Sequence, residues 1–162
     1  MLWVSCPFIQ RVPSGTIIDH SCIDLTMVPV SAIQNAKSTL RIAYGHTSHG
    51  SQITTGMNGL VAFANGSGLE GEFSAYANLF AWNADGSGGA LCLEDSPFAG
   101  ASDLGNPNLT AWEAATLTYL NSNADVNVVI WSWCGQVSGA SEAQIANYLS
   151  LMNQLETDYP GV

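Results

Sequence analysis

The chain has 162 residues and a formal net charge of −10, although only 10% of its residues are charged. The acidity comes from a near absence of Lys and Arg, of which there are three, so the surface cannot neutralise several phosphates. Nucleic-acid binding and attraction to an anionic membrane surface are therefore disfavoured. No run approaches the roughly 18 apolar residues of a membrane span, so we expect a soluble single domain over residues 1–162.

Residues 1–35 are expected to form an irregular N-terminal extension, because Pro7, Pro13 and Pro29 interrupt them. The opening MLWVSCPFIQR has no basic segment and no long apolar segment, so it is not a recognisable signal peptide. The chain either stays inside the cell or is exported by a signal outside this sequence. Its polarity comes from uncharged side chains rather than from charges, a tendency of secreted proteins, so we lean towards an extracellular location.

Four cysteines (Cys6, Cys22, Cys92 and Cys134) show no C-x-x-C spacing, which argues against a zinc ribbon or a thioredoxin motif. A pair such as Cys6 and Cys22 could form a disulfide in an oxidising compartment. The alternative is four partly buried thiols.

The segment from residue 30 to residue 65 predicts a helix, a strand and a second helix. A short helix is expected near 30–37, where SAIQNAK lacks helix breakers, and TLRIAY (39–44) is expected to form a buried strand. From about Ser48 to Asn65 the apolar residues recur every three or four positions, which marks one face of a helix. Gly56 and Gly59 weaken that helix by roughly 1 kcal/mol each relative to alanine, so we expect them where the helix packs closely on a sheet.

Residues 65–109 are rich in loops, with a short strand expected at 89–93. Thr110–Glu113 and Ser141–Gln144 match the capping box that opens a helix, and each precedes an apolar helical pattern. Between these helices lies VNVVIWSW (126–133), the strongest strand pattern of the chain. Its continuous apolar character predicts a central parallel strand that is covered on both faces.

This order of elements predicts an α/β fold with a parallel sheet. After the last helix, the residues DYPGV (158–162) come where the pattern requires a further strand. We therefore expect a fold that is truncated at the C-terminus or completed by something outside this sequence.

Two predicted strand ends are polar, and ligands of open α/β sheets bind at the carboxyl ends of strands. The first strand ends in GHTSHG (45–50), where Ser48 is a candidate nucleophile. A serine needs a nearby base, and amides at a helix N-terminus stabilise an oxyanion. The alternative is that Ser48 is an ordinary helix N-cap.

His46 and His49 admit three interpretations. They could supply a base or a substrate contact, bind a metal as an H-x-x-H pair, or fix the turn by hydrogen bonds. The metal interpretation is weak because a catalytic zinc usually needs three protein ligands. No known ligand spacing makes Asp19, His20 or Cys22 the third ligand. We therefore expect no metal and no other cofactor.

The later strand ends in SWCGQ (132–136), where Gln136 could direct its amide hydrogens at an oxyanion. The alternative is an ordinary loop glutamine. Trp131 and Trp133 flank Ser132 on alternate faces, so one is expected in the core and the other, assigned to Trp133, along a substrate pocket. The glycine-rich loop 83–89 lacks the lysine of a phosphate-binding loop.

The pairing of GHTSHGSQ after the first strand with WSWCGQ after a later one resembles a divergent branch of the SGNH or GDSL-like hydrolases, from about Ala36 onward. This resemblance implies a flavodoxin-like, three-layer α/β/α domain. It also implies that Ser48 is the nucleophile and that Gln136 stands where the family has an oxyanion asparagine. One of Gly86, Gly88 and Gly89 would supply the oxyanion-hole amide.

The sequence departs from the family where GHTS replaces GDS and where the C-terminal D-x-x-H segment is absent. Without its Asp and His, a serine hydrolase keeps only residual activity, unless His46 or His49 acts as the base. We expect an esterase that acts on small-molecule esters or O-acetylated carbohydrates. This chain would be inactive if neither His46 nor His49 acts as the base. The alternatives are a glycan-binding module that uses Trp82, Trp112 or Trp133, and a metal-binding protein that uses His46 and His49. The oligomeric state stays open.

Overall fold

The computed structural model describes residues 11–12, 15–16, 19–22, 27–66 and 78–162. Its centre is a parallel sheet of four strands in the order β4-β5-β3-β6. The strands are β3 (Arg41–Gly45), β4 (Trp82–Asn83), β5 (Leu91–Asp95) and β6 (Val128–Trp131). Two short strands, β1 (Arg11–Val12) and β2 (Gly15–Thr16), pair with each other.

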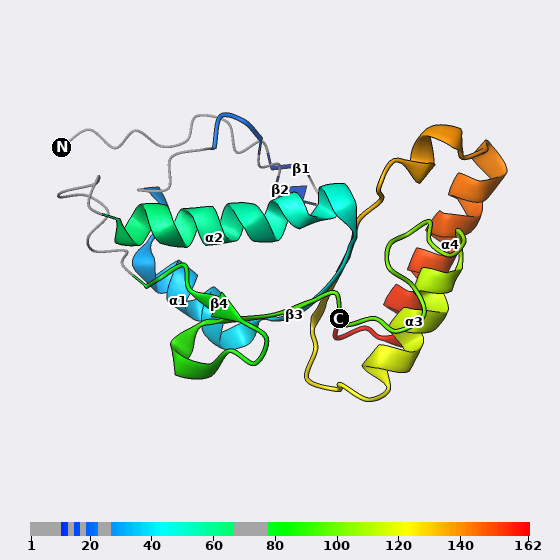
Figure 1. Ribbon diagram of the computed structural model, residues 1–162. Coiled ribbons are helices and arrows are strands. Elements are labelled where there is room, and N and C mark those ends of the chain that lie inside the picture. Colours follow the sequence, from blue (N-terminus) through cyan, green and yellow to red (C-terminus); the bar gives the residue numbers. More distant parts are fainter. Residues whose placement is uncertain (1–10, 13–14, 17–18, 23–26, 67–77) are drawn as a thin grey trace.

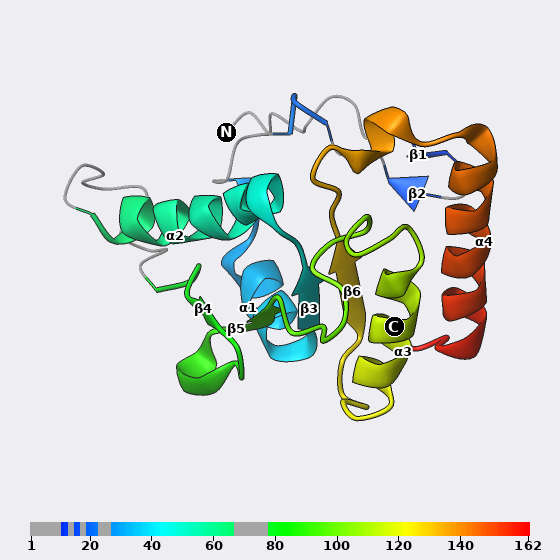
Figure 2. The ribbon, with the colours of Figure 1, turned by 45° about the vertical axis from the view of Figure 1, so that its right-hand side comes forward.

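Helices cover both faces of the sheet, which makes a three-layer α/β/α, flavodoxin-like fold. Figures 1 and 2 show α1 and α2 together on one side, with α3 and α4 on the other. The α-helices are α1 (Val30–Thr39), α2 (Ser51–Asn65), α3 (Ala111–Leu120) and α4 (Glu142–Asp158). The short 3-10 helices are η2 (Ser48–Gly50), η4 (Ser87–Gly89) and η5 (Gln136–Gly139).

Alternating side chains of the strands build a core on each face of the sheet, as the two-residue period of a strand requires. On the side of α3 and α4, Ala43 packs with Phe98 and Trp112. On the opposite face, Ile42 and Tyr44 pack with Leu93. The predicted α/β class is confirmed. Within the described residues, no helix combines the length and apolar character that a membrane crossing requires.

β5 and β3, rather than the predicted strand of residues 126–133, are the interior strands of the described sheet. β6 pairs with β3 on one side only and forms an edge of that sheet, where the side chain of Ile130 is 38% exposed. The prediction of a central β6 is therefore wrong among the described strands. An apolar run indicated burial, but it could not indicate the order of the strands.

Two local predictions on helices were also wrong. Gly56 and Gly59 do not pack on the sheet, because a Cβ atom added at either position would meet nothing within 4 Å. Thr110 precedes α3, but its side chain makes no cap hydrogen bond. Asn108 Oδ1 instead accepts hydrogen bonds from the amides of Thr110 and Ala111. The second predicted capping box, Ser141 with Gln144, is confirmed at the start of α4.

Candidate functional site

The candidate site lies at the carboxyl edge of the sheet, where the chain leaves β3, β5 and β6. The strand register brings the ends of these strands together, because Tyr44 of β3 is paired with Asp95 of β5, and Gly45 of β3 is paired with Trp131 of β6. Side chains that follow these strands therefore meet above the sheet. The candidate site comprises His46, Ser48, His49, Asp95 and Cys134.

Ser48 begins η2 with a backbone φ of 46°, in the left-handed region that L-residues other than Asn and Asp rarely enter. Such a conformation costs of order 1–3 kcal/mol and is typical of turns that present a functional side chain. The residue is exposed. Ser48 therefore lies exposed on the turn between β3 and α2, which is the position that the sequence predicted.

Gly50 lets this turn close tightly over β6. A Cβ atom at Gly50 would lie 2.3 Å from Ser132 Oγ and 2.4 Å from His46 Cβ, which is closer than real contacts allow. The Tyr44 hydroxyl donates a hydrogen bond of 2.8 Å to the carbonyl oxygen of Gly50. A side chain at this position would push the turn away from the strand ends.

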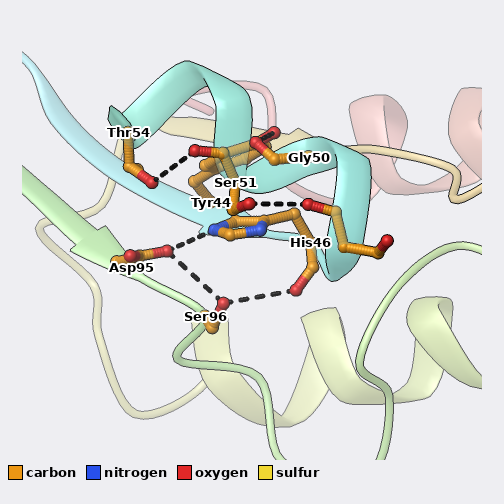
Figure 3. A network of polar contacts seen from close by, with 8 residues as sticks. Tyr44, His46, Gly50, Ser51, Thr54, Asp95 and Ser96 are labelled. Carbon is orange, nitrogen blue, oxygen red and sulfur yellow. Dashed lines mark hydrogen bonds and ion pairs between the residues drawn. The ribbon is translucent and has the colours of Figure 1, made fainter. Parts of the chain in front are cut away.

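His46 is paired with the Asp95 carboxylate, at 2.5 Å from Nε2 to Oδ1, as Figure 3 shows. Its side chain is only 7% exposed, and its ring stacks on that of Tyr44 with centroids 4.4 Å apart. Its second nitrogen, Nδ1, is buried without a hydrogen-bond partner. Ser96 Oγ donates to the His46 carbonyl oxygen at 3.3 Å and lies 3.4 Å from Asp95 Oδ1. His46 is thus enclosed and does not offer a nitrogen to solvent.

His49 has different surroundings, because it is exposed and lies against the thiol of Cys134. The distance from His49 Nδ1 to Cys134 Sγ is 3.4 Å. The Ser48 side chain and the His49 backbone, on the same turn, also act on the thiol and favour its charged form. We call these three residues the Ser48–His49–Cys134 cluster.

These contacts change the acidity of the thiol. The pKa of Cys134 is lowered from 9.0 to about 7, first by the hydrogen bond from the Ser48 side chain and then by those from His49. Hydrogen bonds to the charged form of an acid favour that form. Cys92 shows the opposite behaviour, because burial raises the pKa of its thiol. A thiol with a pKa of about 7 is about half thiolate at neutral pH, far more than an ordinary cysteine.

Gln136 holds the turn that carries Cys134 and does not point at Ser48. Its Oε1 accepts the backbone N–H of Cys134 at 2.9 Å, and its Nε2 donates to both carboxylate oxygens of Asp103 at 3.1 Å. Asp103 is fully buried and also accepts the N–H of Gly105 at 2.7 Å. Because the amide hydrogens of Gln136 are directed at Asp103, the arrangement does not support the predicted oxyanion role.

The glycines assigned to substrate binding lie at the other end of the sheet. Gly86, Gly88 and Gly89 precede β5 and line a cavity of about 670 Å³ together with Arg41, the first residue of β3. Ser48 follows the last residue of β3. The prediction that one of these glycines serves the Ser48 site is therefore wrong, because parallel strands place the two ends of the sheet apart.

The tryptophans proposed for sugar stacking belong to the packing of the protein. Trp133 lies against Tyr148 of α4, with ring centroids 4.9 Å apart, and its Nε1 is buried. Trp112 is fully buried, and Trp82 is half-buried and donates to Asn58 Oδ1 at 3.1 Å. These contacts do not support a pocket role for Trp133, and the glycan-binding alternative stays a prediction.

The two histidines do not converge on a common point, since Asp95 holds one and Cys134 holds the other. Among the residues that the structure describes, no three His, Cys, Asp or Glu side chains form a group that could hold a metal ion. The H-x-x-H metal interpretation therefore has no support here. Cys6, half of the suggested disulfide, lies outside the described residues, and Cys92 and Cys134 are free thiols.

Sequence reasoning missed three residues of this region: Asp95, Asp103 and Cys134. Asp95 closes β5, so the rule that sites lie at carboxyl strand ends could have found it. Cys134 lies within the motif WSWCGQ at the end of a predicted strand, so its position in that motif could have found it. For Asp103, in the long loop before α3, the sequence carries no signal.

Comparisons with known proteins identify no relative: no protein-family model matches the chain, no curated protein is similar to it, and no solved structure matches it.

Proposed function

We propose that this protein hydrolyses carboxylic esters through a covalent acyl intermediate at the carboxyl edge of its sheet. The observation that supports this most is the Ser48–His49–Cys134 cluster, in which an exposed imidazole lies 3.4 Å from the Cys134 sulfur and the Ser48 side chain lowers the pKa of the same thiol. Covalent acyl transfer needs a nucleophile and a group that moves protons, held within hydrogen-bond reach.

The cluster offers two atoms for the covalent step. The Ser48 hydroxyl oxygen is the atom that the resemblance to SGNH hydrolases favours, and its position on a strained turn agrees with that role. The Cys134 sulfur is the second. Of the two histidines, His49 is the proton-transfer group that substrate can reach, because Nδ1 of His46 is enclosed and its Nε2 faces Asp95.

The charge of the chain favours an uncharged substrate. With a net charge of −10 and three Lys and Arg residues, the surface repels phosphates and other anions. Neutral esters, such as acetyl groups on a small molecule or on a carbohydrate, meet no such penalty. We therefore propose O-acetyl esters as the substrate class.

The test is ester hydrolysis by the full chain, with p-nitrophenyl acetate and acetylated xylan as probes. We expect turnover by the unmodified protein and its loss in the double variant Ser48→Ala with Cys134→Ala, which removes both nucleophilic atoms. Cys92→Ala is the matched control, because it removes a buried thiol outside the candidate site. If the double variant hydrolysed both probes as fast as the unmodified protein, ester hydrolysis at this site would be excluded.

A further inference from the structure

Two nucleophilic side chains touch each other in the candidate site, and the structure separates their roles. The His49 imidazole lies against the Cys134 sulfur, with Nδ1 at 3.4 Å from Sγ, and the Ser48 side chain lowers the pKa of that thiol. A serine attacks only after a base has taken its proton, whereas a thiolate attacks as it stands. Here the imidazole lies against the sulfur, and Ser48 acts on the thiol beside it.

The turn that follows β3 places His49 against the Cys134 sulfur, with Nδ1 at 3.4 Å from Sγ. The Ser48 side chain and the His49 backbone, on the same turn, also favour the charged form of this thiol. An imidazole beside a thiol is the arrangement that activates cysteine nucleophiles in general. The turn is thus arranged to hold a negative sulfur.

The backbone that carries the Cys134 side chain is also fixed. Gln136 bonds the backbone N–H of Cys134, and buried Asp103 holds the Gln136 side chain with two contacts of 3.1 Å. Gly135, between Cys134 and Gln136, has a φ of 90°, which a glycine adopts without strain. A cysteine whose backbone is anchored and whose sulfur lies against an imidazole is preorganised for attack.

From these contacts we propose that the Cys134 sulfur is the attacking atom of the candidate site, with His49 as its proton-transfer partner and Ser48 as a positioning residue. The acyl intermediate is then a thioester. This inference rests on the ester hydrolysis proposed above and identifies the nucleophile of that same site.

The reaction closes without any further reagent. The Cys134 thiolate attacks the ester carbonyl carbon, a C–S bond forms, the C–O bond to the alcohol breaks, and the alcohol leaves with a proton from the His49 imidazolium. Neutral His49 then takes a proton from water as its oxygen attacks the thioester. The C–S bond breaks, the carboxylic acid departs, and the thiolate and the imidazolium are restored.

The decisive experiment locates the acyl group. The full chain is mixed with p-nitrophenyl acetate, quenched in acid within the first turnovers and digested, and the acetylated peptide is identified by mass spectrometry. We expect an acetyl group on Cys134 that neutral hydroxylamine removes, because thioesters are cleaved under conditions in which serine esters persist. An acetyl group on Ser48 that survives hydroxylamine would overturn this proposal while leaving the proposed function intact.

Variants separate the attacking atom from the positioning residue. Cys134→Ser keeps the shape of the side chain, and we expect kcat/KM to fall by about 1000-fold or more, because a serine there has no lowered pKa. Ser48→Ala should reduce kcat/KM by about tenfold and shift the pH profile to higher pH, because the thiolate loses a hydrogen bond. Thermal unfolding of each variant checks that it is folded. Greater activity in Cys134→Ser than in Ser48→Ala would contradict the assignment.

A chemical probe tests the thiolate independently of turnover. Because its pKa is lowered from 9.0 to about 7, Cys134 should react with iodoacetamide along a pH profile with its midpoint near 7. Buried Cys92 should react slowly at every pH in the same sample. A Cys134 midpoint near 9 would overturn the proposal, whatever the esterase assay shows. Absence of turnover with both esters would remove the proposed function, and this inference with it.

Discussion

His46 and His49 stand on one turn, three positions apart in the sequence, yet they lie in different surroundings. The pair His46–Asp95 has its imidazole buried against Tyr44, with the second ring nitrogen enclosed. The pair His49–Cys134 is accessible, and its thiol has a lowered pKa. Sequence spacing alone makes these two histidines look equivalent.

The difference between the pairs indicates a division of labour. A buried imidazole with one nitrogen on a carboxylate and the other enclosed can hold a turn together, but it cannot exchange protons with a substrate. An exposed imidazole against a thiol can do so, and its partner is a nucleophile. The pair His46–Asp95 therefore supports the architecture, and the pair His49–Cys134 carries the proposed chemistry. Four predictions test this division.

The largest effect is expected at Asp103, because it holds Gln136, which in turn holds the backbone of Cys134. Asp103→Ala should lower the free energy of unfolding by about 3 kcal/mol. The substitution removes a buried carboxylate that accepts hydrogen bonds from Gly105 and Gln136, so those two donors lose their partners. Urea denaturation measures the loss. Asp103→Asn keeps an acceptor oxygen and should lose less. Equal and small losses in both variants would show that the buried network does not anchor the Cys134 turn.

The two histidines should respond oppositely to removal. His46→Ala should cost about 2 kcal/mol of stability, because it removes a buried ring from its contacts with Tyr44 and Asp95. His49→Ala, at an exposed position, should change stability by no more than about 0.5 kcal/mol. The same His49 variant should slow the alkylation of Cys134 at neutral pH, whereas the His46 variant should not. Similar stability losses in both variants would remove the distinction between the pairs.

A third prediction concerns the glycine that closes the turn between the two pairs. Gly50→Ala should destabilise the protein by about 1.5 kcal/mol, because its Cβ would meet His46 Cβ, which cannot move aside as the Ser132 hydroxyl can. Gly56→Ala is the matched control within α2, where a Cβ meets nothing, and it should stabilise by about 0.5–1 kcal/mol. Thermal unfolding of both variants gives the comparison, and a neutral Gly50→Ala would argue against close packing at this turn.

The smallest effect is expected at Asp95, whose side chain is 40% exposed. Asp95→Asn keeps an acceptor oxygen for His46 and should cost about 0.5–1 kcal/mol, because solvent screens the lost charge. Asp158→Asn, an exposed carboxylate near the end of α4 that accepts from Gln154, should cost less. Chemical denaturation of both variants, with ester hydrolysis measured alongside, checks the order. A large loss of activity in Asp95→Asn without loss of stability would move His46 into the chemistry.

Local patterns located most elements of the described fold. Apolar spacing found the strand that became β3 and the helix that became α2, and the capping box at Ser141 marked the start of α4. The pattern at Thr110 was wrong because Asn108 supplies the cap instead. Such competition between neighbouring side chains is decided by backbone geometry, which the pattern of residues does not contain.

The sequence by itself determined that the fold is α/β with a parallel sheet, and that the polar ends of two strands carry the candidate site. Both follow from local chemistry: the periodicity of apolar residues, and polar segments directly after strands. Only the tertiary structure decided that His46 takes Asp95, that His49 and Ser48 take Cys134, and that Gln136 serves Asp103. His49 and Cys134, for example, are 85 positions apart in the sequence. They depend on strand order and register, which single-sequence patterns leave open.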